Sequence, residues 1–176
     1  MDISALPILS LIIFSPVLGI AFVAMFRDEG NGIPAKVAAL TSGCITFLLS
    51  LHLWFNFDSS TADLQMVEKI PWISQFNIEY FLGLDGLNLF FFLLITFITP
   101  LTLLGSWNVG KRNWQFQIQM LLLQIGMLGC FAAMDVVLFY VFFEVMLVPM
   151  YLLIGIWGVT PASILGAAAL SLLELF

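Results

Sequence analysis

Charged residues are scarce in this chain of 176 residues, of which only 9% are acidic or basic, whereas a typical soluble domain has about 25%. Only five residues are basic, and they are scattered along the chain, which leaves no basic patch for nucleic acid. The sequence also lacks the cysteine, histidine and glycine spacings that are typical of metal, haem, P-loop and dinucleotide sites. We therefore expect no cofactor, no metal and no nucleic-acid partner for this chain.

Cysteine is also scarce, since Cys44 and Cys130 are the two residues of this type. Both lie inside apolar runs, and we interpret them as small buried apolar residues rather than as a disulfide or a metal site. Apolar side chains are in excess and make up 62% of the residues. A soluble chain of this length could not bury so many, whereas a lipid bilayer accommodates them.

Five apolar stretches are long enough to cross a bilayer, for which about 20 residues are needed. A cleaved signal peptide is a poorer interpretation of the first stretch, because no basic residue precedes it and the stretch is long. The chain is thus one transmembrane domain over residues 1–176. We predict helices at about 6–26, 37–57, 87–106, 114–133 and 136–157, and a possible short helix at 161–176.

Residues 58–86 differ in kind, because six of them are charged and so many charges are too costly inside lipid. Apolar and polar residues alternate around 75–80, which favours extended strands. Pro71 and Trp72 indicate contact with the membrane interface. The predicted fold is therefore an all-α integral membrane protein, a polytopic bundle of transmembrane helices, with a short hairpin outside the membrane.

The basic residues predict the orientation of the helices. With alternating spans, four of the five basic residues share one side of the membrane, and Lys69 lies on the other. Loops rich in lysine and arginine remain in the cytoplasm. We therefore expect the N-terminus and residues 58–86 outside, and these four residues inside: Arg27, Lys36, Lys111 and Arg112.

Glu144 is the candidate working residue, because this carboxylate lies near the middle of an otherwise apolar span. At ~1.5 Å per residue it lies about 12 Å along the predicted helix from Val136. A charge at that depth costs about 3 kcal/mol and is tolerated when it faces a protein cavity, pairs with a cation or is protonated. Pro149 supports the site, because it leaves the carbonyl of Val145 without a helical donor. We predict a role in proton translocation, and the alternative is an interhelical ion pair that only stabilises packing.

Asp135 and His52 are weaker candidates, because both lie at predicted membrane boundaries. For Asp135 a solvated turn residue is the favoured interpretation, and for His52 an interfacial or packed histidine is favoured over a proton relay. Amides inside lipid need partners, so we expect the glutamine-bearing face of the fourth helix to pack on protein. Its glutamines are Gln115, Gln117, Gln119 and Gln124.

Two segments resemble a known family. Residues 142–158 read FFEVMLVPMYLLIGIWG, and Trp72-Ile73 is followed at residues 80–87 by YFLGLDGL. Both closely resemble the antiporter-like membrane subunits of respiratory complex I, the proton-pumping NADH:quinone oxidoreductase. Among these subunits, the match is to the bacterial subunit M (chain 4) family.

The resemblance implies the N-terminal part of an antiporter-like fold, in a subunit that moves protons and has no redox centre of its own. In this family the glutamate at the position of Glu144 pairs with a lysine on a later helix. The implied partners are other membrane-arm subunits, including neighbouring antiporter-like subunits, with phospholipid around them in the bacterial inner membrane. FMN, iron–sulfur clusters, NADH and quinone are expected in the partner subunits.

Two other functions remain open at this point. A membrane subunit of a cation/proton antiporter or of a membrane-bound hydrogenase would share the glutamate-bearing helix, although the detail of residues 142–158 favours complex I. The alternative of another class is a truncated structural or assembly subunit that moves no protons. It rests on the five or six spans of this sequence, which do not include the later helix with the partner lysine.

Overall fold

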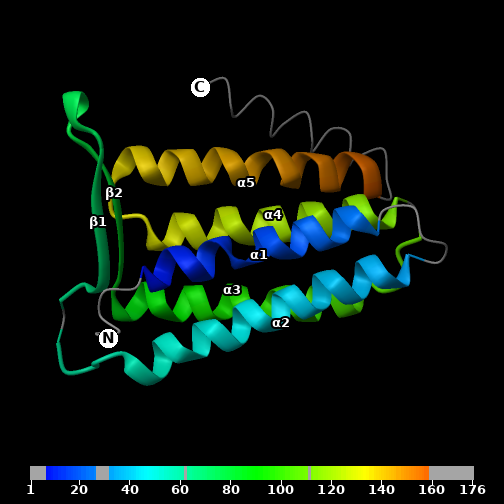
Figure 1. Cartoon of the computed structure of the whole chain (residues 1–176), viewed down its shortest axis with the longest axis horizontal. Coiled ribbons are helices and arrows are strands. Elements are labelled where there is room, and N and C mark those ends of the chain that lie inside the picture. Colours follow the sequence, from blue (N-terminus) through cyan, green and yellow to red (C-terminus); the bar gives the residue numbers. More distant parts are fainter. Residues whose placement is uncertain (1–6, 27–31, 62, 111, 159–176) are drawn as a thin grey trace.

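The computed structural model describes residues 7–26, 32–61, 63–110 and 112–158. Five helices lie side by side along the long axis of the molecule, and a two-stranded hairpin lies across one end of them (Figure 1). All five are long and apolar enough to cross a membrane, which confirms the predicted fold class. They are α1 (Ile8–Met25), α2 (Ile33–Asn56), α3 (Gly86–Gly105), α4 (Asn113–Ala132) and α5 (Val136–Trp157). The possible helix at 161–176 lies outside the described residues.

Aspartate side chains cap two of the helices, and a proline lies in the first turn of a third. The carboxylate of Asp85 accepts a hydrogen bond of 2.7 Å from the backbone N–H of Asn88, and thereby caps α3. Asp135 caps α5 in the same way. Helix α2 begins earlier than the sequence suggested, because Pro34 falls in its first turn. A proline there loses no helical hydrogen bond.

Small residues allow the helices to approach closely around α4, which packs against each of the other four. A Cβ atom at Gly19 of α1 would overlap the side chain of Ser42 of α2. A Cβ atom at Gly126 of α4 would lie 2.9 Å from the backbone nitrogen of Met146 of α5. Close backbone approach through small residues is typical of helix packing in membranes, where water does not drive helices together.

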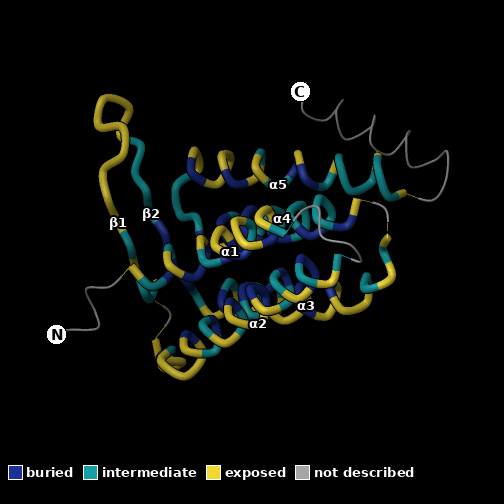
Figure 2. Tube along the Cα trace, turned by 45° about the vertical axis from the view of Figure 1, so that its right-hand side comes forward, coloured by how far each residue is buried: buried dark blue, intermediate teal, exposed yellow. Residues whose placement is uncertain are grey.

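The outward faces of the helices are apolar and exposed, as a bilayer requires (Figure 2). Cys44 on α2 is exposed, so the expectation that it is buried is wrong. In lipid, an apolar residue is as stable on the outside of the helix bundle as in its interior. Helix α5 is the least buried of the five described helices. Within its most apolar stretch of 18 residues, 22% of the residues are buried, compared with 33–44% in the other four helices.

The hairpin consists of β1 (Gln65–Ile73) and β2 (Ile78–Leu84), which pair in antiparallel fashion and are joined through a 3-10 turn at Ser74–Phe76. Asn77 completes the connection in the left-handed conformation, with φ of 53°. The hairpin is attached to the bundle through β2, because the N–H of Met134 donates a hydrogen bond of 2.9 Å to the carbonyl of Phe81. This contact joins the hairpin to the turn between α4 and α5.

Candidate functional site

Glu144 lies on α5, about 12 Å along the helix axis from Val136 at ~1.5 Å per residue. Its side chain is partly exposed. Leu147, on the adjoining face of the helix, is buried, whereas Tyr140 and Val148, one turn before and after Glu144, are exposed. The carboxylate therefore lies at the edge of the face that α5 presents to α4, and not in the packed interior of the bundle.

Within the described part of the chain, the carboxylate of Glu144 has neither a hydrogen bond nor an ion pair, and the basic side chains lie elsewhere. Lys69 binds Glu79 of the hairpin at 2.8 Å. The ammonium of Lys36 lies 5.8 Å from the ring centroid of Trp107. An ionised carboxylate at mid-membrane depth needs a cation or a polar cavity. The described residues supply no cation for Glu144, so such a partner would have to come from elsewhere.

The backbone beside Glu144 offers a further polar group. Pro149 lies inside α5 and is buried. Because proline has no N–H, the carbonyl oxygen of Val145 receives no helical hydrogen bond from residue 149. A carboxyl group and an unpaired carbonyl on one turn of a helix are suitable ligands for a water molecule. This arrangement can hold the end of a proton path.

The two weaker candidates lie away from Glu144. The carboxylate of Asp135 accepts hydrogen bonds of 2.8 Å from the N–H of Val137 and 3.1 Å from that of Leu138, so it has a capping role at the start of α5. His52 is exposed near the end of α2, where the side-chain amide of Asn56 lies 3.2 Å from its ring nitrogens. Helices α2 and α5 lie on opposite sides of the bundle in both views (Figures 1 and 2).

Hydroxyl pairs across helix boundaries form a polar interior that the sequence analysis missed. Ser15 of α1 shares a hydrogen bond of 2.8 Å with Thr46 of α2, and Ser50 of α2 shares one of 2.7 Å with Thr96 of α3. The signal was present, because Ser42, Thr46 and Ser50 are spaced by four residues and so share one helix face.

The glutamines of α4 divide between two environments. Gln117 and Gln124 are buried, as expected of a face that packs on protein. The amide of Gln117 donates a hydrogen bond of 3.1 Å to the side chain of Asn113. Both polar atoms of the Gln124 amide are buried and have no partner in the described chain. Gln115 and Gln119 instead face a cavity beside α5.

A carboxylate from the hairpin caps α1, and nothing in the sequence indicated this contact. The N–H of Leu9 donates a hydrogen bond of 2.6 Å to Glu68, and both the N–H and the hydroxyl of Ser10 also donate to this carboxylate. The hydroxyl of Tyr80 lies 2.7 Å from that of Ser10. Burial raises the pKa of Tyr80 above its ordinary 10.0, the bond to Ser10 opposes the rise, and the nearby Glu68 adds to it.

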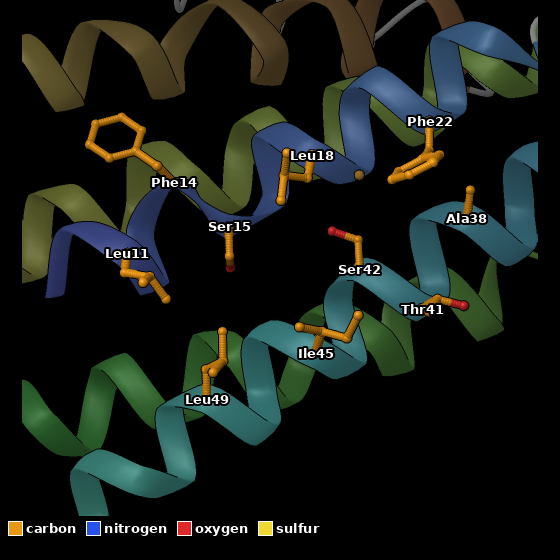
Figure 3. Close-up of a pocket in the computed structure, with 11 residues that line it drawn as sticks. Leu11, Phe14, Ser15, Leu18, Phe22, Ala38, Thr41, Ser42, Ile45 and Leu49 are labelled. Atoms are coloured by element: carbon orange, nitrogen blue, oxygen red, sulfur yellow. The ribbon is translucent and has the colours of Figure 1, made fainter. Parts of the chain in front are cut away.

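A groove of about 670 Å³ lies between α1 and α2. Phe14, Leu18 and Phe22 line it from α1, and Ile45 and Leu49 line it from α2 (Figure 3). No ionisable side chain is among its lining residues. The groove can therefore hold apolar chains but carries no proton chemistry, so the candidate site remains Glu144.

The chain is similar to known proteins over most of its described length. A family model described as "NADH:quinone oxidoreductase/Mrp antiporter, TM" matches residues 133–176. NADH-quinone oxidoreductase subunit M of Rhodobacter capsulatus is 43% identical over 155 residues, which are 86% of this chain and 30% of the relative. NADH-ubiquinone oxidoreductase chain 4 of Arabidopsis thaliana is 41% identical over 152 residues, which are 85% of this chain and 30% of the relative.

A solved structure shows the same arrangement of helices. Respiratory complex I from Thermus thermophilus with bound NADH contains a chain that is 27% identical, with a TM-score of 0.65. The match covers 83% of this chain and 29% of that one. This chain thus spans about 30% of the length of the curated relatives it matches. Over the part that it spans, it is similar to the antiporter-like membrane subunits known as subunit M or chain 4 of NADH:quinone oxidoreductase.

Proposed function

We propose that this chain is part of a proton-translocating subunit in the membrane arm of NADH:quinone oxidoreductase, in which Glu144 takes up and releases protons. The observation that carries the proposal is a carboxylate near the middle of a membrane helix with no partner in the described chain. It lies within the residues that the family model matches. A structural ion pair with a later helix would also leave Glu144 without a partner within the described chain, so a Glu144→Gln variant is needed to separate the two roles.

The proposed chemistry is a change in the proton affinity of one carboxyl group. Burial in an apolar setting favours the protonated form, and an approaching cation favours the ionised form. A lysine from a later helix, as the family resemblance implies, would supply that cation. Movement of the cation toward Glu144 would release the proton, and its withdrawal would allow reprotonation from water at the Val145 carbonyl.

The remaining parts of the machinery belong to partner subunits in this proposal. FMN, iron–sulfur clusters, NADH and quinone are placed there, and electron transfer in those subunits would drive the movement of the cation. Other membrane-arm subunits, including further antiporter-like ones, would be the neighbours. We place the chain in the bacterial inner membrane, with its N-terminus and the hairpin outside, on the basis of its basic residues.

The test is Glu144→Gln in the full-length subunit within its complex. Glutamine keeps the size and hydrogen-bonding capacity of the side chain but cannot release a proton near pH 7. We expect proton translocation in membrane vesicles, measured with a pH-gradient probe during quinone-dependent NADH oxidation, to fall at least about tenfold, as for loss of a proton-transfer group. The complex content of the membranes should be unchanged.

Glu79→Gln is the matched control, because it makes the same chemical change at a hairpin glutamate outside the helices. It should leave translocation unchanged. Normal pumping by the Glu144→Gln protein, at normal complex content, would reduce Glu144 to a packing residue and favour the structural or assembly role. The family model also covers Mrp antiporters, and a Glu144-dependent sodium/proton exchange without NADH oxidation would point to that class.

A further inference from the structure

A second cavity, of about 280 Å³, lies between the first turns of α4 and the last turns of α5. These turns lie at the end of the bundle opposite the hairpin (Figure 1). Arg112 precedes α4, and Gln115 and Gln119 lie about 5 Å and about 11 Å further along the axis, at ~1.5 Å per residue. Leu152 and Ile156 line the cavity from α5. The cavity thus combines a cation at its outer end with amides on the α4 side and an apolar wall on the α5 side.

The outer end of the cavity attracts anions. Arg112 is exposed and has no ion pair within the described chain. It is the residue directly before α4, and no side chain caps the N–H groups of the first turn. These unpaired donors and the helix dipole add to the positive potential of the guanidinium. Among the lining residues no acid balances this charge.

The two sides of the cavity differ in polarity. Gln115 and Gln119 line it from α4, and the side-chain oxygen of Gln119 is buried without a partner in the described residues. By rotation, such an amide presents either its oxygen or its NH₂ group. Leu152 and Ile156 of α5, together with Ile118, supply the apolar lining.

Two tryptophans place the cavity at the boundary of the membrane. Trp114 and Trp157 both line it, and the ring of Trp157 packs at 5.4 Å, centroid to centroid, on that of Phe116. Tryptophan is enriched at the level of lipid headgroups. The cavity is also at the membrane face that carries most of the basic residues, where anionic lipids are attracted.

We propose that this cavity binds one anionic phospholipid. The phosphodiester would lie on Arg112 and the first turn of α4, the glycerol esters beside Gln115 and Gln119, and one acyl chain on the apolar wall. A cation at the outer end beside an apolar wall on α5 matches an amphiphilic anion, whereas a soluble anion would leave the apolar wall without a partner. A choline or ethanolamine headgroup would place its cation beside Arg112, where no acidic lining residue stabilises it. The inference does not depend on the role of Glu144.

The experiment uses the full-length protein in its native complex, purified in detergent and depleted of loosely bound lipid. It is titrated with phosphatidylglycerol or phosphatidylcholine, and retained lipid is counted by native mass spectrometry. Arg112→Gln should weaken phosphatidylglycerol binding about tenfold, as expected for the loss of a charge-assisted contact. Arg112→Lys, which keeps the charge, should retain most of the binding.

Lys36→Gln is the matched control, because it removes the same charge at the start of α2 without lining the cavity. It should leave binding unchanged. Leu152→Trp fills the space beside the apolar wall on α5 and should also displace the lipid, independently of any effect of Arg112 on folding. Equal binding of both lipids, or wild-type binding by the Arg112→Gln and Leu152→Trp proteins, would overturn the proposal. The absence of retained phosphatidylglycerol would also overturn it, because the cavity would then not be open to lipid.

Discussion

In the bundle of α1–α4 hydroxyl side chains pair across helix boundaries, whereas on α5 the carboxylate of Glu144 has no partner within the described chain. Ser15 meets Thr46 and Ser50 meets Thr96, each across a helix boundary. Such pairs contribute about 0.6 kcal/mol each in membrane proteins, and they fix the register of neighbouring helices. Glu144 adds nothing of this kind within the described chain. The paired hydroxyl groups of α1–α4 therefore stabilise helix packing, whereas the carboxylate of Glu144 takes no part in such packing within the described chain.

The two regions also differ in whether the side chain without a partner can carry a charge. Gln124, deep in the α1–α4 bundle, also lacks partners, but its amide is neutral and costs about 1–3 kcal/mol when unpaired. An unpaired carboxylate at the same depth would cost more, and it can avoid that cost by taking up a proton. The comparison teaches that a missing partner matters functionally when the group can titrate.

The largest expected loss of stability follows from a substitution that pushes α5 away from α4. A Cβ atom at Gly126 would lie 2.9 Å from the backbone nitrogen and 3.0 Å from the Cα of Met146. Because backbone atoms cannot move aside, Gly126→Ala should displace α5 and destabilise the protein by about 1–3 kcal/mol. The measurement is the midpoint of thermal unfolding of the purified protein, together with its content in membranes.

Gly155→Ala is the control for that substitution, since Gly155 also lies inside a helix but a Cβ atom there would have nothing within 4 Å in the described structure. Alanine favours helix over glycine, so this variant should be as stable as wild type or slightly more stable. If both variants behave alike, the close approach of α4 and α5 is not what holds α5 in place.

A smaller effect is expected where the hairpin supports the α1–α4 region. Glu68→Ala removes the cap of α1 and should lower stability by about 1 kcal/mol, as at other helix starts. Glu79→Ala removes only the ion pair with Lys69, which is partly exposed, and should cost at most about 0.5 kcal/mol. Thermal unfolding of the two variants side by side measures the difference. Equal losses would mean that the cap contributes no more than a surface ion pair.

The smallest effect is expected at Gln124. Gln124→Leu replaces a buried, unpaired amide by an apolar side chain of similar size, so stability should change by less than about 1 kcal/mol or increase. Proton translocation should remain at the wild-type level. A large loss of translocation in this variant would show that the α1–α4 interior also conducts protons, and the contrast with Glu144 would fail.

Length and hydropathy predicted the five long apolar helices and the extended segment between the second and third, because each depends on local composition. Depth along one helix pointed to Glu144, whose role stays a prediction. Contacts between distant segments were not predictable in this way. Nothing local connects Glu68 with Leu9, or Gly126 with Met146. The exposure of Cys44 was missed for a different reason, since hydrophobicity does not separate inside from outside in a bilayer.

The cap that Glu68 provides for α1 can form only after later segments of the chain have been synthesised. Helix α1 is synthesised first, but its first N–H groups gain their acceptor only when β1 has reached the same side of the membrane, after α2 has crossed. Unpaired N–H groups are not stable in hydrocarbon, so until then the start of α1 must remain in contact with water. The final depth of the first span is therefore set late, by a segment outside the described helices.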